Sequence, residues 1–225
     1  MVDQPSPPPA RMVPLLLLVS ATTGLVDAVS VLGLGRVFTA NMTGNIVFLG
    51  FALAGTPGYS WLLCSVALLS FLVGAGAGGR LSQRSELVGR RRWLIAAATS
   101  EAILLFGAAT VAGFGMALLD PILVMVALTG CAMGIRNANA RRLKVPDLTT
   151  TVLTLTITGI AADSHFAGGT NPNFLRRLSA VSSILVGALL GALMVRSWNL
   201  AAPLAIAGAV ILGGTVALAS DEEGR

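Results

Sequence analysis

The chain has 225 residues, of which 55% are hydrophobic and 11% are charged, with a formal net charge of +5 and a mean hydropathy of +0.82. Soluble domains carry about 25% charged residues, so this composition argues against a soluble enzyme, a nucleic-acid-binding protein or a disordered scaffold. Several apolar runs also approach the roughly 20 residues that a helix needs to cross a bilayer. We therefore predict an all-α, polytopic membrane protein.

The predicted elements follow the apolar runs in chain order. Six runs are long enough to span a membrane: 13–34, 60–79, 93–113, 121–135, 178–195 and 199–219. Two runs, at 43–55 and 148–162, are shorter and contain Thr, Asn and Gly, and we expect two short half-helices there. The membrane domain is predicted over residues 13–219, between a disordered N-terminal tail at 1–12 and a C-terminal tail at 220–225.

The two halves of the chain resemble each other in the order of their elements and in local sequence. Three segments of the first half match three of the second, namely 24–28 with 134–138, 39–46 with 150–157, and 72–78 with 185–191. The offsets of 110, 111 and 113 residues are nearly constant. This pattern predicts an internal duplication, with repeat one at 13–113 and repeat two at 121–219.

Two topologies are compatible with this duplication. If the short segments cross the membrane, there are eight spans and parallel halves, and the Lys and Arg residues divide 11 to 4 between the two sides. If the short segments are re-entrant, there are six spans and inverted halves, and the division is 13 to 2, with only Arg36 and Arg196 outside. Basic loops stay in the cytoplasm, so we favour the six-span, inverted arrangement. This count places Arg136 in a cytoplasmic loop at 136–147.

Three segments carry a resemblance to a known family: 23–28 (TGLVDA), 37–45 (VFTANMTGN) and 133–138 (MGIRNA). Together they resemble the YoaK family of bacterial multi-pass inner-membrane proteins, and the resemblance extends over residues 13–219. It implies a location in the bacterial inner (plasma) membrane and about six helical spans, but no established function. The second half departs from the family pattern, which carries Thr-Gly where this chain has Thr154 and Leu155.

Asp27 lies well inside the first predicted span. An ionised carboxylate at that depth must be paired, hydrated or protonated. We predict that Asp27 is an ion or proton site whose neighbours are hydroxyls and amides of the short segment, such as Thr43 or Asn45. The alternative is that Asp27 holds two helices together by a hydrogen bond.

Glu101 is the second acidic residue inside an apolar run. No basic residue lies within one helical turn of it, so a partner must come from another helix, and Arg136 and Asn137 are the candidates. We predict that Glu101 is a secondary proton relay. The alternative is a polar residue near the membrane surface that is paired or extends its carboxylate to water.

The beginnings of the two short segments are rich in polar residues. A helix N-terminus carries unpaired N–H groups and a partial positive charge, and irregular backbone within a membrane survives only where it is buried or lines a watery cavity. We predict that the short segments line a solute site; alternatively, their polar groups satisfy one another at a packed junction. The predicted solute-site residues are Asn41, Thr43, Gly44, Asn45, Asn137, Thr154 and Thr156, with Thr150 and Thr151 at the same edge.

Two pairs of glycines have the small-xxx-small spacing that lets helices approach closely: Gly74 with Gly78, and Gly187 with Gly191. They are expected to pack the two halves together or to form a homodimer. The sequence contains no HExxH, paired CxxC, GxSxG or P-loop motif. We therefore expect no enzymatic activity, cofactor, metal site or nucleic-acid partner.

These observations favour a secondary transporter or exporter of a small solute, coupled to protons through Asp27. The alternative is a non-transporting scaffold or regulatory protein whose buried polar residues are structural. A passive channel is a third reading, which a continuous polar pore would favour.

Overall fold

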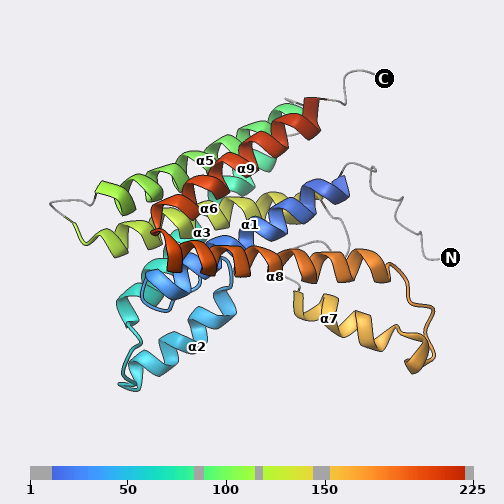
Figure 1. Cartoon of the computed structure of the whole chain (residues 1–225), viewed down its shortest axis with the longest axis horizontal. Coiled ribbons are helices and arrows are strands. Elements are labelled where there is room, and N and C mark those ends of the chain that lie inside the picture. Colours follow the sequence, from blue (N-terminus) through green and yellow to red (C-terminus); the bar gives the residue numbers. More distant parts are fainter. Residues whose placement is uncertain (1–11, 84–88, 115–118, 144–152, 221–225) are drawn as a thin grey trace.

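The computed structural model describes residues 12–83, 89–114, 119–143 and 153–220. Within these residues the chain forms eight α-helices and one short 3₁₀ helix (Figure 1). The elements are α1 (Met12–Gly33), α2 (Met42–Leu53), α3 (Trp61–Gln83), α5 (Arg90–Phe114), α6 (Pro121–Leu143), α7 (Leu153–Ala162), η2 (His165–Ala167), α8 (Phe174–Ser197) and α9 (Ala201–Ser220). Apart from Met12 and Ser220, the predicted tails lie outside the described residues, as do Thr150 and Thr151.

Six of the described helices are long enough and apolar enough to cross a membrane: α1, α3, α5, α6, α8 and α9. The helices α2 and α7 are shorter, with 12 and 10 residues. The prediction of an all-helical protein with six long spans and two short helices is therefore confirmed.

The largest difference from the predicted boundaries is in α6. The apolar run ends at residue 135, but the helix continues to Leu143 because the polar residues that follow are buried in the protein. Arg136 is only 3% exposed. The assignment of Arg136 to a cytoplasmic loop is therefore wrong: a polar residue that ends an apolar run can equally be the inward-facing residue of a longer helix.

The helix α1 packs closely along α8 through glycines that have no room for a side chain. A Cβ atom on Gly24 would overlap the backbone of Ile184 and Ala188 on α8. Likewise, a Cβ atom on Gly187 would overlap the backbone of Ala21 on α1. Small residues allow this close approach of two backbones.

The helices α3 and α6 form a second pair of the same kind. A Cβ atom on Gly134 would overlap the backbone of Phe71 and Ala75, and one on Gly74 would overlap the backbone of Cys131. The predicted glycine pairs on α3 and α8 thus pack against α6 and α1 within one chain. These glycines therefore join α3 to α6 and α1 to α8.

The six long helices alternate in direction along the chain. The helices α1, α5 and α8 run one way, and α3, α6 and α9 run the other way (Figure 1). Two hydrogen bonds show that α5 and α6 are antiparallel. Trp93, near the start of α5, bonds Asn139, near the end of α6. Glu101, farther along α5, bonds Arg136, which lies earlier in α6. Because successive long helices alternate, neither α2 nor α7 carries the chain across the bundle.

Charged and apolar residues are distributed as this arrangement requires. Eight described arginines lie at one end of the bundle, namely Arg80, Arg90, Arg91, Arg92, Arg141, Arg142, Arg176 and Arg177, and two lie at the other, Arg36 and Arg196. Large apolar side chains such as Leu72 on α3 and Leu189 on α8 are exposed on the flanks of the bundle. An apolar surface of this extent suits contact with lipid rather than with water.

Candidate functional site

A cavity of about 780 Å³ lies where the two short helices begin. Its lining comes from α1, α2, α3, α7 and α8 and from the connection between α1 and α2. Small-molecule sites in proteins typically measure about 300–1,000 Å³, so this cavity is large enough for a small organic solute. Its polar lining residues are Thr23, Asp27, Asn41, Thr43 and Thr154.

The two short helices are arranged with their first turns toward the middle of the molecule and their last turns toward its opposite ends (Figure 1). The helix α2 begins after Asn41, whose side chain makes no capping hydrogen bond, and Met42 and Thr43 line the cavity. Leu153 and Thr154 at the described start of α7 also line the cavity. Both helices therefore direct the partial positive charge of their N-termini toward the same space.

Asp27 on α1 lines this cavity and is half-buried. Its Oδ1 atom accepts hydrogen bonds from the backbone N–H groups of Thr39 at 3.2 Å and Ala40 at 3.0 Å. The partners of Asp27 are thus backbone groups rather than the predicted side chains of Thr43 or Asn45. No described residue donates a hydrogen bond to Oδ2.

Asn45 fixes the segment that carries these N–H groups. Its Oδ1 accepts from the backbone N–H of Phe38 at 2.9 Å, and its Nδ2 donates to the carbonyl oxygen of Phe38 at 2.6 Å. Asn45 is fully buried. It is therefore a positioning residue that holds the connection between α1 and α2 and does not itself line the cavity.

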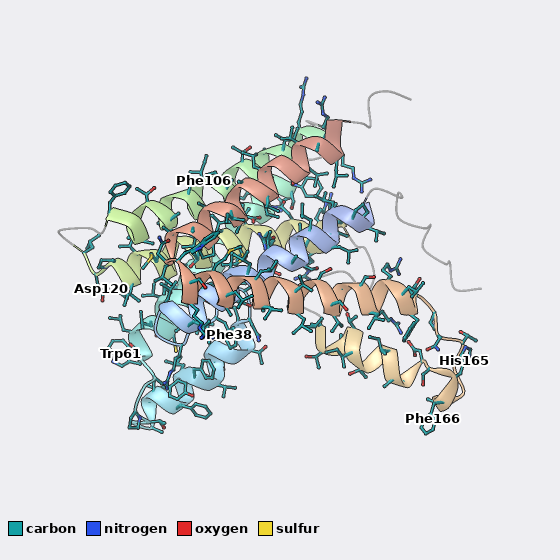
Figure 2. All side chains as sticks on the ribbon, viewed as in Figure 1. Phe38, Trp61, Phe106, Asp120, His165 and Phe166 are labelled. Atoms are coloured by element: carbon teal, nitrogen blue, oxygen red, sulfur yellow. The ribbon has the colours of Figure 1, made fainter. Side chains whose placement is uncertain are left out.

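The aromatic ring of Phe38 forms part of the cavity wall. It stacks on Phe48 with a centroid distance of 5.7 Å, and it lies near the middle of the molecule beside α2 (Figure 2). Gly44 makes room for this ring, because a Cβ atom at that position would lie 2.7 Å from a ring carbon. The role of Gly44 is thus to admit Phe38.

Glu101 lies outside this cavity, in a buried ion pair with Arg136. The Nε and Nη2 atoms of Arg136 both donate to Oε1 of Glu101, the first at 3.0 Å. The Nη1 atom donates to the Val19 carbonyl oxygen at 3.1 Å and to Thr23 Oγ1 at 2.7 Å. The pair therefore joins α5, α6 and α1, and it lines a separate, smaller cavity of about 50 Å³.

The structure brings together some of the predicted site residues and separates others. Asp27, Asn41, Thr43 and Thr154 line the large cavity, and Glu101 lines the small one. Asn137 is buried in α6, where its Nδ2 donates to the Met133 carbonyl oxygen at 2.9 Å, and Thr156 is buried in α7. Neither lines the large cavity.

Sequence reasoning missed most of the cavity wall, including Thr23, Phe38 and Phe71. Thr23 precedes Asp27 by one helical turn, and this i, i+4 spacing could have identified it. Phe38 and Phe71 carry no polar signal, and their place in the wall depends on the fold. Within the described ranges, no group of three or more His, Cys, Asp or Glu side chains could hold a metal ion.

Six long apolar helices define a multi-pass integral membrane protein. The chain belongs to the family described as "Protein of unknown function (DUF1275)", which matches residues 15–217. It is 33% identical over 186 residues to the UPF0700 transmembrane protein YoaK of Bacillus subtilis (strain 168), covering 80% of this chain and 82% of that protein. The resemblance predicted from the sequence motifs is thereby confirmed. No solved structure matches the chain.

Proposed function

We propose that this protein is a secondary transporter or exporter of a small solute, and that Asp27 couples solute movement to protons. One observation carries the proposal: a cavity of about 780 Å³ joins the first turns of α2 and α7 and contains Asp27. Half-helices whose N-termini meet near the membrane midplane are a common way to build a transport site. An acidic side chain beside such a cavity is a group that a proton and a solute can occupy in turn.

We further propose that the chain consists of two inverted repeats, in which α1, α2, α3 and α5 correspond to α6, α7, α8 and α9. The glycine contacts support this, because each contact between α1 and α8 has a counterpart between α6 and α3. A Cβ atom on Gly191 would lie 3.0 Å from the Cβ of Ala28, and one on Gly78 would lie 3.0 Å from the Cβ of Ala138. The corresponding long helices also run in opposite directions.

Inverted repeats support a mechanism of alternating access. The helix α2 packs on α3, and α7 packs on α8, so each short helix can move with its long neighbour as one unit. Rocking of one unit against the other would open the cavity first to one side and then to the other. The end with the eight described arginines faces the cytoplasm in this proposal, because basic residues are retained on that side.

The transport proposal is testable with the purified protein in liposomes that enclose a pH-sensitive dye. Three probes of similar size share a benzene ring and differ in charge: benzyltrimethylammonium, phenylalanine and benzenesulfonate. We expect at least one probe to enter in a protein-dependent manner and to move protons. Asp27→Asn should abolish the proton movement, whereas Asp120→Asn, which changes an exposed acid at the end of the molecule (Figure 2), should not. Wild-type protein that admits none of the three probes would contradict the proposal.

A structural role is the second candidate function. It is favoured by the hydrogen bonds that Asp27 and Asn45 make to the backbone of residues 38–40. If these polar residues serve only to hold α1 and α2 together, Asp27→Leu, which removes the accepting oxygen, should lower the stability of the protein, and no probe should cross the membrane in wild type or variant. If they serve transport, Asp27→Asn should spare stability, because the Asn side chain retains the oxygen that accepts the two N–H groups, and it should still lose proton movement.

A further inference from the structure

The charge of the large cavity restricts what it can bind. Among the described residues that line it, Asp27 is the one charged side chain. Arg136 does not line the cavity, and it is already paired with Glu101 and donates to Thr23. The negative charge of Asp27 therefore has no dedicated positive side chain within the described part of the chain.

The rest of the wall is predominantly apolar. Two aromatic rings, Phe38 and Phe71, and aliphatic side chains such as Ile157 and Ile184 line the cavity. Aromatic faces attract cations, particularly where water is excluded. An apolar wall with one carboxylate is thus complementary to a molecule that has an apolar body and a single positive charge.

The N-termini of α2 and α7 contribute partial positive charges of about 0.5 each. They do not make the cavity an anion site, because an anion between them would meet the carboxylate of Asp27 directly. Two backbone N–H groups of the connection that precedes α2, those of Thr39 and Ala40, already donate to Oδ1 of Asp27. Thr43 and Thr154 at the helix starts also line the cavity and can offer their hydroxyls to a polar substituent.

We propose that the cavity binds a monovalent organic cation whose charge faces Asp27 and whose apolar body rests against Phe38 and Phe71. This inference names the class of solute. It rests on the proposed function only for the statement that the bound cation is transported. Binding itself is a separate property and can be measured without any transport.

The test is calorimetric titration of the whole protein in lipid nanodiscs, with empty nanodiscs as the blank. Benzyltrimethylammonium should bind, and phenylalanine and benzenesulfonate should bind at least about tenfold more weakly, because they place a carboxylate or sulfonate near Asp27. Asp27→Asn should weaken binding of the cation by about ten- to a hundredfold, whereas Asp120→Asn should leave it unchanged. Phe71→Leu should weaken it by about three- to tenfold through loss of the ring face.

Asp27→Glu provides a check that does not depend on removing the charge. This variant keeps the carboxylate, so it should retain the binding of benzyltrimethylammonium that Asp27→Asn loses. The thermal unfolding of the Asp27→Glu variant should be the same as that of the wild type. Preferred binding of benzenesulfonate, or equal binding of the cation to wild type and Asp27→Asn, would overturn the inference. Uptake of phenylalanine or benzenesulfonate alone would refute the solute class while preserving transport. Binding of the cation without uptake of any probe would preserve the solute class and refute transport.

Discussion

The two acidic residues within the membrane helices, Glu101 and Asp27, have contrasting surroundings. Glu101 is 5% exposed and bonded by two nitrogen atoms of Arg136. Asp27 is half-buried beside a large cavity and accepts only two backbone N–H groups, both at one oxygen. The difference indicates that the charge of Glu101 is satisfied within the protein, and it supports our proposal that the charge of Asp27 serves a ligand or proton that enters the cavity.

The largest change in the free energy of unfolding is expected when the ion pair of Glu101 is broken. Arg136→Met leaves a buried carboxylate without its partner, which costs about 3–5 kcal/mol in the free energy of unfolding. Unfolding by sodium dodecyl sulfate in mixed micelles provides the measurement. The double variant Glu101→Gln, Arg136→Met should recover most of the loss, because no unpaired charge then remains. A double variant as unstable as Arg136→Met alone would show that the pair is not the source of the effect.

A smaller effect is expected where the backbone near Asp27 is held in place. Asn45→Leu removes both hydrogen bonds to Phe38 and leaves buried backbone groups unpaired, which should destabilise the protein by about 1–3 kcal/mol. Asn41, four residues earlier, is exposed and makes no capping bond. Asn41→Ala is therefore the matched control and should change stability by less than about 0.5 kcal/mol. Equal losses in the two variants would argue against Asn45 as the residue that holds this segment.

Asp27→Asn should separate stability from function most clearly. The variant keeps an oxygen for Thr39 and Ala40, so its free energy of unfolding should lie within about 1 kcal/mol of wild type. Its proton movement should be lost, and its binding of the cation should be weakened by about ten- to a hundredfold. A loss of stability as large as that of Arg136→Met would place Asp27 in the same structural class as Glu101.

The smallest effect is expected for an acid outside the spans. Asp163 pairs with Arg177 at 2.7 Å, and its side chain is 43% exposed. Water and salt screen such a pair, so Asp163→Asn should cost no more than about 1 kcal/mol. The same unfolding assay measures it, and added salt should reduce the difference from wild type further. A cost comparable with that of Arg136→Met would mean that exposure does not set the strength of these pairs.

The sequence was sufficient to predict the helical class, because the length of an apolar run reports directly on the bilayer thickness. The short helices at 42–53 and 153–162 were also predictable, since Asn and Thr interrupt their apolar runs. Arg136 was misassigned because a charge after an apolar run resembles a loop, and only its neighbours on α5 and α1 reveal that it is buried. The backbone partners of Asp27 were unpredictable, because every residue has an N–H group and only the fold selects two of them.

The central claim is that the short helices meet around a water-accessible cavity within the membrane. Thr154 and Leu155 are adjacent on α7, and Thr154 lines the cavity whereas Leu155 does not line it and is 67% exposed. In a Cys64→Ala, Cys131→Ala background, Thr154→Cys and Leu155→Cys can each be treated in native membranes with a membrane-impermeant, positively charged methanethiosulfonate reagent. We predict that the thiol of Thr154→Cys reacts, that benzyltrimethylammonium slows the reaction, and that the lipid-facing thiol of Leu155→Cys stays unmodified. An unreactive Thr154→Cys, or equal reaction at the two positions, would contradict the account.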